Sequence, residues 1–263
     1  MSYPSFAGYL TLDSTIDHQL NQTSYNPFYH PAVPCQAELN YPMIQAGENW
    51  AALYPGKIFS KGSSLCPNIA LTFDDVPDSL FTPILLDLLK NYQVRATFFL
   101  IGECALRNPA IIKRMVVEGH TIANHSYDHQ NLTKLPPEKV KEEIIKTELA
   151  IQEITGLRTA LFRPPYGALN QTSAEIILSL GYKIIFWNVD SRDWSGITGP
   201  MIASNVVPNV HNGSIILMHS ICGGNNQTHM NSLQSLPYII EILRASGYSF
   251  VSIPELLQIP AYQ

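Results

Sequence analysis

The sequence has little charge and no cluster of basic residues. Only 14% of the 263 residues are Asp, Glu, Lys or Arg, and the formal net charge is −5. Without a block of Lys and Arg, the chain lacks the electrostatic pattern by which proteins bind nucleic acid. Its apolar runs are short and interrupted by polar residues, so none is long enough to cross a membrane. We therefore expect a globular protein with no nucleic-acid partner and no membrane span.

A signal peptide and a paired cysteine motif are also missing. The first residues, MSYPSFAGYL, contain no basic segment followed by a long apolar core. The four cysteines, at positions 35, 66, 104 and 222, include no CxxC pair, which argues against a zinc knuckle or a thioredoxin-type site. One or two disulfides, for example Cys35–Cys66, fit the sequence as well as free thiols do. Asn-x-Ser/Thr sequons, as at Asn131, permit secretion without establishing it.

Two regions of different composition divide the chain. Residues 1–60 are rich in Tyr, Pro, Asn and Gln without a sustained period, so we predict an irregular N-terminal extension there. In residues 61–263, the predicted main domain, short β-type runs alternate with helical patterns. The predicted strands are residues 69–73, 96–101, 121–125, 160–164, 183–189, 214–219 and 249–253. The predicted helices are residues 80–92, 108–118, 136–155, 172–180, 199–207 and 231–246.

Apolar strands that alternate with helices predict a parallel α/β fold. An open sheet and a barrel both fit this alternation. Polar residues follow the C-terminal ends of several different strands, and in a barrel those ends meet at one mouth. No Gly-rich turn follows the first strand, which argues against a nucleotide-binding sheet. We therefore predict a distorted, incomplete (β/α)7-type barrel. The strand-end residues are Asp74, Asp75, His125, Arg163, Asp190 and His219.

Two segments combine acids and histidines. TFDD (72–75) ends a strand with adjacent carboxylates, which can line one pocket as a metal ligand and a base because the chain turns there. By itself, TFDD is more typical of a solvated strand end. HSYDH (125–129) has two imidazoles four residues apart, and with one carboxylate they form a metal site that leaves positions open for water and substrate. Two surface histidines explain HSYDH by itself equally well.

Three further segments follow later strands. In RPPYG (163–167), Arg163 either holds a carboxylate by a two-pronged hydrogen bond or belongs to a structural turn. DSRDW (190–194) and LMH (217–219) add two acids, an aromatic residue and a third histidine. By themselves, Trp194 is more typical of a core residue and His219 of a buried, hydrogen-bonded histidine. Each signal is weak alone, whereas their occurrence at successive strand ends strongly indicates one site.

The ordered set TFDD, HSYDH, RPPYG, DSRDW and LMH resembles the motifs of the polysaccharide deacetylase family, the NodB-homology group of carbohydrate esterase family 4. The resemblance covers roughly residues 66–257. It implies a distorted (β/α) barrel, in agreement with the prediction above. It also implies hydrolysis of N-acetyl groups, and occasionally O-acetyl groups, on polymers such as chitin, peptidoglycan and xylan.

Carried over by motif, the resemblance implies a metal site with an adjacent base. Asp75, His125 and His129 would bind one divalent metal ion, zinc or alternatively cobalt. Asp74 would be the general base, and Arg163 would orient it. Val76 stands where the family usually has Gly, so we expect the loop after TFDD to adopt a backbone conformation that Val tolerates.

The remaining motifs imply a general acid and a substrate pocket. His219 would be the general acid and Asp193 would orient it. The backbone N–H of Tyr166 would help to hold the oxyanion. Trp194 and Leu217 would line the pocket for the acetyl methyl group.

The expected activity is metal-dependent removal of N-acetyl groups from N-acetylglucosamine-containing chitin, chitooligosaccharides or peptidoglycan, with release of acetate. Two alternatives are an acetylxylan O-esterase and a catalytically inactive, carbohydrate-binding member of the family. The expected partner is an acetylated glycan polymer or oligomer. We expect a monomer that acts outside the cytoplasm, as a secreted, cell-surface or periplasmic protein.

Overall fold

The computed structural model describes residues 49–223 and 226–263. Most of the predicted N-terminal extension, including Cys35, therefore lies outside the described residues, and the domain boundary at residue 60 stays a prediction. The described end of that region contributes a short helix at residues 49–53 and the first strand of the sheet. Among the described residues, no helix combines the length and the apolar composition needed to cross a bilayer.

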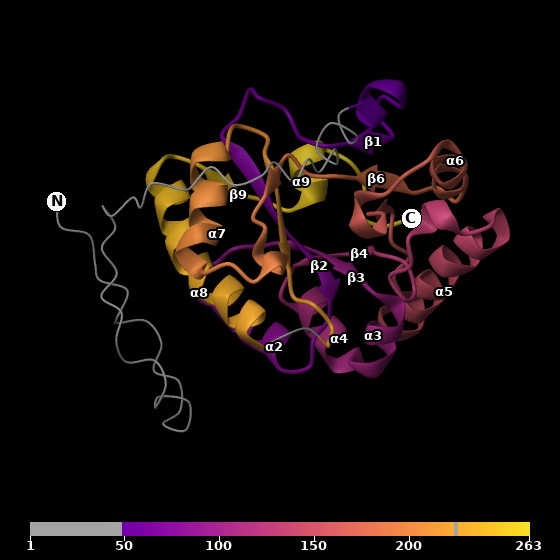
Figure 1. Cartoon of the computed structure of the whole chain (residues 1–263), viewed down its shortest axis with the longest axis horizontal. Helices are drawn as coiled ribbons and strands as arrows, with labels where there is room; N and C mark the ends of the chain where they lie inside the picture. The colour runs from indigo at the N-terminus through magenta and orange to yellow at the C-terminus, as the bar shows by residue number, and fades with distance from the viewer. Residues whose placement is uncertain (1–48, 224–225) are drawn as a thin grey trace. The chain divides into compact units, whose positions relative to one another are not determined.

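The strands form a parallel sheet around which the helices α2 to α8 are arranged (Figure 1). Their order across the sheet is β1-β6-β5-β4-β3-β2-β8-β7, and β9 pairs with β2. Every pairing between these strands is parallel, so their C-terminal ends share one side of the sheet. The strands are β1 (Ile58–Phe59), β2 (Asn68–Val76), β3 (Thr97–Leu100), β4 (Thr121–Asn124), β5 (Leu161–Phe162), β6 (Lys183–Ile185), β7 (Val189–Asp190), β8 (Ile215–His219) and β9 (Ser249–Phe250).

Each of the six predicted helices is present, whereas the helices at residues 102–107 and 253–257 were not predicted. The predicted helix at 136–155 is confirmed: it begins with Pro137, whose missing N–H needs no partner in the first turn, and it ends at Gly156, which has a left-handed φ of 76°. The helices are α2 (Phe81–Asn91), α3 (Gly102–Arg107), α4 (Pro109–Val117), α5 (Pro137–Thr155), α6 (Gln171–Ser179), α7 (Gly199–Val206), α8 (Asn226–Ala245) and α9 (Ile253–Leu257). The 3₁₀ helices in the described part of the chain are η3 (Leu132–Lys134), η4 (Pro165–Gly167), η5 (Asp193–Ser195) and η6 (Val207–Asn209).

The predicted strand at 183–189 is two strands, β6 and β7, at different places in the sheet. β6 pairs with β5 and β1, whereas β7 pairs with β8. The segment between them hydrogen-bonds to both neighbours: Phe186 N–H donates to Phe59 O at 2.7 Å, and Asn188 N–H donates to Ile215 O at 3.2 Å. One chain segment thus connects the two edges of the sheet, in agreement with the predicted incomplete barrel.

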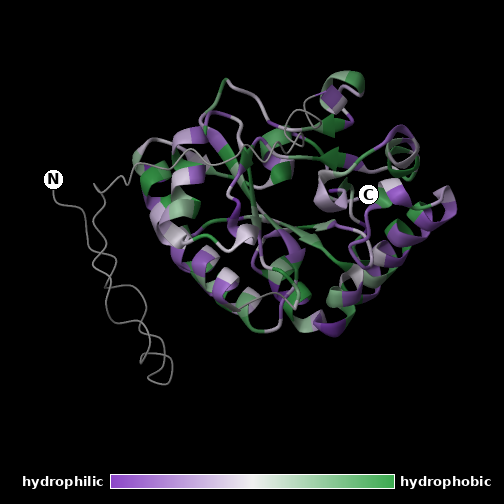
Figure 2. Cartoon of the chain, viewed as in Figure 1, coloured by the Kyte–Doolittle hydropathy of each residue, from purple (hydrophilic) through white to green (hydrophobic). Residues whose placement is uncertain are grey.

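Both faces of the central strands are buried, as expected of a parallel sheet covered by helices. Neighbouring residues enter different apolar clusters: Phe98 packs with Phe73 and the side chains of α2 and α8, whereas Phe99 packs with Phe162 and Ile184. Figure 2 shows the same arrangement, with hydrophobic strands inside and helices that carry both hydrophilic and hydrophobic residues around them. This double burial explains why the strands read as continuous apolar runs.

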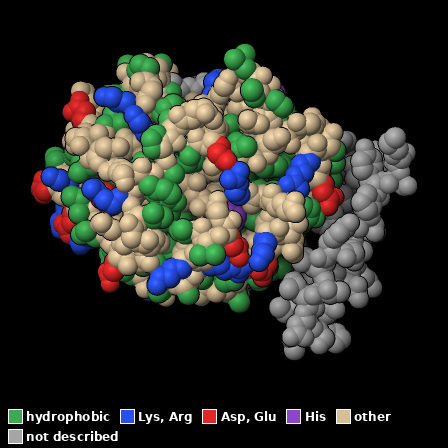
Figure 3. Space-filling view, turned by 180° about the vertical axis from the view of Figure 1, so that it is seen from behind, with side chains coloured by type: hydrophobic (Ala, Val, Ile, Leu, Met, Phe, Trp, Pro, Cys, Tyr) green, Lys and Arg blue, Asp and Glu red, His purple; other side chains and the backbone are tan. Residues whose placement is uncertain are grey.

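The described surface carries charges of both signs. On the face shown in Figure 3, basic and acidic side chains are interspersed over the described residues rather than gathered in one patch. Exposed ion pairs such as Arg95–Glu255 and Arg107–Glu103 belong to this pattern.

One disulfide joins distant parts of the barrel. It connects Cys104 in α3 to Cys222 in the loop after β8, across a separation of 118 residues. Cys66 is exposed and forms no disulfide within the described residues, whereas Cys35 lies outside them, so the Cys35–Cys66 pairing stays an expectation from the sequence. The sequence did not single out the true pair, because Cys104 and Cys222 come together only when α3 and the β8 loop meet at the same side of the sheet.

Candidate active site

Asp75, His125 and His129 converge at the C-terminal side of the sheet. Asp75 lies near the end of β2, and both histidines lie in the loop after β4. Asp75 Oδ1 is 3.4 Å from His125 Nε2 and 3.1 Å from His129 Nε2. One ligand atom from each of the three residues lies within 4.8 Å of the other two. The three residues predicted from TFDD and HSYDH are therefore brought together.

Unusual backbone conformations aim these side chains at one point. Asp75, Ser126 and His129 have φ values of 63°, 68° and 62°, in the left-handed region that non-glycine residues rarely occupy. Along a regular strand, Asp74 and Asp75 would point to opposite faces. The left-handed φ of Asp75 breaks this alternation, so both carboxylates lie near His125, at 3.7 and 3.4 Å from its Nε2. Val76 is buried, pairs with Leu100 in β3 and has no positive φ, so the Gly that the family usually has is not needed here.

The environment of the three residues fits a cation. The Nδ1–H of His125 donates to the backbone carbonyl of Arg163 at 2.7 Å, which leaves Nε2 directed at the carboxylates. Burial by itself would lower the pKa of His125, but Asp74 and Asp75 raise it, so a positive charge is favoured at this point. Asp75 Oδ1 is buried and receives no hydrogen bond. One carboxylate oxygen and two imidazole nitrogens are a donor set suited to zinc and similar divalent ions.

At neutral pH, Asp75 is ionised and His129 is uncharged. Burial opposes the ionisation of Asp75, but contact with His125 and the charges of His219 and His129 outweigh burial, so the pKa of Asp75 lies well below its ordinary value. Burial and the neighbouring His125 lower the pKa of His129. A carboxylate and a neutral imidazole are the protonation states in which these side chains bind metal ions.

Asp74 is held by Arg163, which is fully buried. Arg163 Nη1 donates to Asp74 Oδ1 at 2.7 Å and to Thr72 Oγ1 at 2.9 Å. Its Nε and Nη2 donate to the carbonyls of Ile185 and Phe186, at 3.0 and 3.1 Å. The predicted two-pronged bond to a carboxylate is therefore wrong, because the remaining donors are taken by backbone carbonyls. This arrangement fixes one oxygen of Asp74 and leaves Oδ2 on the side of His125.

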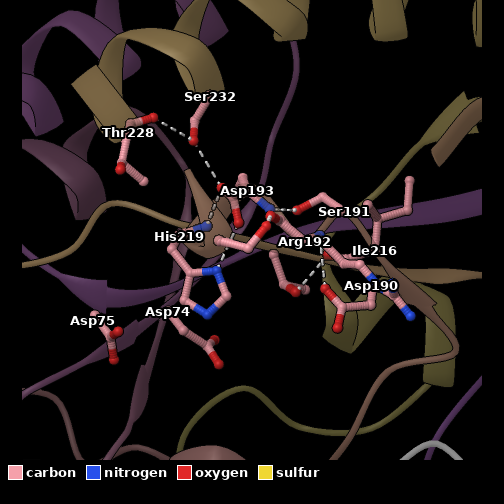
Figure 4. Close-up of polar contacts among 12 residues, drawn as sticks. Asp74, Asp75, Asp190, Ser191, Arg192, Asp193, Ile216, His219, Thr228 and Ser232 are labelled. Atoms are coloured by element: carbon pink, nitrogen blue, oxygen red, sulfur yellow. Dashed lines mark hydrogen bonds and ion pairs between the residues drawn. The ribbon is translucent and has the colours of Figure 1, made fainter. Parts of the chain in front are cut away.

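His219 and Asp193 form a second pair beside Asp74 (Figure 4). In the pairing of β2 with β8, His219 lies directly opposite Asp74. The Nδ1–H of His219 donates to Asp193 Oδ1 at 2.8 Å, while Asp193 Oδ2 accepts from the His219 backbone N–H and from Ser232 Oγ, both at 2.9 Å. Burial opposes protonation of His219, but the charge and hydrogen bond of Asp193 raise its pKa to about 9. His219 is therefore protonated at neutral pH.

The predicted substrate-binding residues lie around these groups. Tyr166 lies in η4 with a left-handed φ of 59°, is 53% exposed, and its ring contacts His129 with 4.5 Å between centroids. Trp194 lies in η5, is 39% exposed and hydrogen-bonds to Asp190. Leu217 is buried in β8, two residues before His219 and on the same face of that strand.

Several residues that the sequence did not single out support the site. Asn124 Oδ1 accepts the N–H of Ser126 at 2.9 Å, while its amide nitrogen donates to Ile144 O and Tyr182 Oη. The N–H groups of Ser220 and Cys222 donate to the carbonyls of Asp74 and Asp75, at 3.1 and 2.8 Å. No sequence signal marks these residues, because their partners are contributed by other strands and loops.

A barrel whose mouth combines a candidate metal site, a carboxylate held by Arg and a His–Asp pair defines a hydrolase. The Polysaccharide deacetylase family profile matches residues 61–185. A peptidoglycan-N-acetylglucosamine deacetylase of Bacillus cereus is 42% identical over 190 residues, which cover 72% of this chain and 68% of the relative. The corresponding enzyme PgdA of Listeria monocytogenes is 41% identical over 72% of this chain, which spans only 38% of that relative.

Solved structures agree with these relatives. A peptidoglycan N-acetylglucosamine deacetylase in complex with a hydroxamic acid has a TM-score of 0.75 and 39% identity, over 78% of this chain and 94% of that one. A pseudoenzyme of carbohydrate esterase family 4 from Bacillus anthracis has a TM-score of 0.69 and 28% identity, over 77% of this chain and 69% of that one. The chain belongs to the polysaccharide deacetylase family, which confirms the resemblance and the barrel fold inferred from the sequence.

Replacing Arg163 by Met should destabilise the protein strongly, because it leaves the buried Asp74 carboxylate without its cation. We expect a loss of about 3–5 kcal/mol in the free energy of unfolding, measured by urea denaturation in the presence of a chelator. Arg158→Met is the control: Arg158 is exposed and pairs with Glu148, so its loss should cost no more than about 1 kcal/mol. Adding Asp74→Asn to Arg163→Met should recover part of the loss. Equal effects of the two single substitutions would contradict this explanation.

Proposed function

We propose that this chain is a metal-dependent deacetylase that hydrolyses the N-acetyl groups of N-acetylglucosamine residues in peptidoglycan and releases acetate. The observation that supports this proposal most strongly is the Asp75–His125–His129 cluster, beside which Asp74 and His219 lie opposite each other in the sheet. Peptidoglycan is favoured as the substrate because the relatives above, at 41–42% identity, are named for it. A chitooligosaccharide deacetylase of Azorhizobium caulinodans is 32% identical over 71% of this chain, so chitooligosaccharides are the second candidate substrate.

Asp75, His125 and His129 hold the divalent ion in this proposal, with zinc favoured by the ligand set and cobalt as the alternative. When bound, such an ion supplies a Lewis acid that polarises the acetyl carbonyl and lowers the pKa of water. Asp74 takes the proton of the attacking water on Oδ2, because Arg163 already occupies Oδ1. The water oxygen then forms a bond to the acetyl carbon.

His219 completes the reaction as the general acid. Its Nδ1 is bonded to Asp193, so Nε2 carries the proton that is delivered to the glucosamine nitrogen as the C–N bond breaks. The products are acetate and a free amine. The backbone N–H of Tyr166 is the proposed donor to the oxyanion, and Trp194 and Leu217 are the proposed walls of the acetyl pocket.

The His219–Asp193 pair also favours an amide over an ester as the substrate. An amine leaves poorly without a proton, whereas an alcohol depends less on protonation. An acetylxylan esterase is therefore a weaker candidate, although a domain of a termite-gut xylanase is 35% identical with a TM-score of 0.65. A catalytically inactive protein is disfavoured because the residues proposed as base, acid and ligands are all present, with Asp74 opposite His219 in the sheet and Asp75 close to His125 and His129. Action outside the cytoplasm follows from the location of peptidoglycan, and the monomeric state stays a prediction.

Acetate release tests the proposal directly. The purified chain, supplied with zinc or cobalt, should release acetate from peptidoglycan, with less from chitooligosaccharides and least from acetylxylan. A chelator should stop the release, and added metal should restore it. No release from any of the three glycans by a protein that binds metal would contradict the proposal. Release from acetylxylan alone would establish the esterase instead.

Two substitutions separate the base from the metal ligands. Asp74→Asn should lower kcat by roughly 100- to 10,000-fold while the metal content stays near that of the wild type, because only the proton acceptor is lost. His129→Ala should lower both activity and metal content, because a ligand is lost. Metal analysis of the purified variants beside the acetate assay distinguishes these effects. Full activity of Asp74→Asn would show that the base is another group.

Activity should depend on the protonation of His219. Because Asp193 raises the pKa of His219 to about 9, kcat/KM should fall as the pH rises through that value and His219 loses its proton. In Asp193→Asn the charge that raises the pKa is gone, so the fall should begin at lower pH. An activated acetyl ester, whose leaving group departs without a proton, is the control and should not show this alkaline decline. An unchanged alkaline limb in Asp193→Asn would exclude His219 as its source.

A further inference from the structure

The two histidines of the proposed metal site are joined by a short turn, Ser126–Tyr127–Asp128, here called the ligand turn. Ser126 and His129 both have left-handed backbones, with φ values of 68° and 62°. Such conformations are strained in non-glycine residues and persist only where surrounding contacts impose them. The contacts of the ligand turn therefore determine where the His129 side chain lies.

The N-terminal end of α3 holds the carbonyl groups of the ligand turn. Gly102 N–H donates to Ser126 O, and Glu103 N–H donates to Tyr127 O, both at 3.0 Å. A side-chain carbon at Gly102 would lie 2.6 Å from Thr147 Oγ1 and 2.8 Å from the ring of Tyr127. α3, α5 and the ligand turn are therefore packed against one another with no spare room.

Glu143 in α5 holds the N–H groups of the ligand turn. Its Oε2 accepts from the N–H of Tyr127 at 2.9 Å and from that of Asp128 at 3.2 Å. Glu143 is 7% exposed, yet within the described part of the chain it forms no ion pair. Buried carboxylates are rare without a compensating partner. The hydrogen bonds from the two backbone N–H groups offset the cost of burying this carboxylate, and they tie it to the ligand turn.

The neighbouring Glu142 shows what an ordinary surface glutamate does on the same helix. Its carboxylate is exposed and pairs with Lys139 and Lys146 at 2.7 and 2.6 Å. The apolar packing of α5 is provided by other residues, among them Val140, Ile144 and Ile151. The hydrogen bonds of the Glu143 carboxylate to the described chain thus go to the ligand turn, whereas helix packing uses other side chains.

We propose that Glu143 is a positioning residue for the metal centre, which fixes the ligand turn so that His125 and His129 face Asp75 together. The inference rests on the proposed function, since it assigns a role toward the same metal site. Without Glu143, the N–H groups of Tyr127 and Asp128 lose their acceptor, and the left-handed residues on either side are free to relax. His129 would then leave its position 3.1 Å from Asp75.

The test measures the affinity of the full chain for zinc by competition with a chromophoric chelator. Glu143→Leu keeps the size of the side chain but has no acceptor, and it should bind zinc about 10- to 100-fold more weakly, as expected for residues that orient metal ligands. Glu143→Gln keeps an acceptor oxygen without the charge, and its affinity should lie between those of Glu143→Leu and the wild type. Glu142→Gln is the matched control and should bind zinc like the wild type.

Two further measurements separate positioning from a general loss of stability. Urea unfolding in the presence of a chelator shows whether the variants are folded without metal. The visible absorption spectrum of the cobalt-substituted protein reports the arrangement of the ligands, and it should change in Glu143→Leu but not in Glu142→Gln. A folded Glu143→Leu protein with unchanged zinc affinity and spectrum overturns the inference.

Should Glu143→Leu fail to fold, amide hydrogen exchange in Glu143→Gln decides the matter. Exchange at Tyr127 and Asp128 should be faster than in the wild type, because a neutral oxygen holds these N–H groups less tightly than a carboxylate. Unchanged exchange together with unchanged zinc affinity overturns the inference. A wild-type protein that binds no divalent ion refutes the metal site of the proposed function itself, which is a separate outcome.

Discussion

The buried guanidinium of Arg163 is the interaction on which the rest of the site depends. Its donors reach Thr72 and Asp74 in β2 and the carbonyls of Ile185, at the end of β6, and of Phe186, which follows it, while its own carbonyl accepts the proton of His125. Burying a charge is unfavourable unless its donors are satisfied. Because these partners come from β2, from the end of β6 and from the loop after β4, the hydrogen bonds of this one side chain require those parts of the barrel to be correctly placed.

The order of the strands explains how the proposed acid and the proposed base come to lie side by side. β2 lies between β3 and β8, and its pairing with β8 sets Asp74 opposite His219. Each of the two is then fixed by a partner of opposite charge, Arg163 for the carboxylate and Asp193 for the imidazole. The proposed proton acceptor and the proposed proton donor are thus neighbours in the sheet, and each is held by its own partner.

The site was largely predictable from the sequence because each of its side chains directly follows a strand, and parallel strands end on one side. TFDD and HSYDH therefore identified Asp75, His125 and His129, and the period of α5 gave its bounds. The division of residues 183–189 into β6 and β7 was not predictable, since an apolar run does not specify which strand it pairs with. Glu143 was equally hidden, because its sequence context matches that of the exposed Glu142.

The disulfide has a topological consequence. It closes residues 104–222 into a covalent ring, and this ring contains both histidines of the proposed metal site, Arg163 and the His219–Asp193 pair. Asp74 and Asp75 lie outside the ring, on a strand that inserts between β3 and β8. Detachment of that strand would remove the proposed base and the proposed carboxylate ligand in a single event, while the other groups stay tethered. On the proposed function, loss of bound metal would therefore accompany the loss of β2 from the sheet.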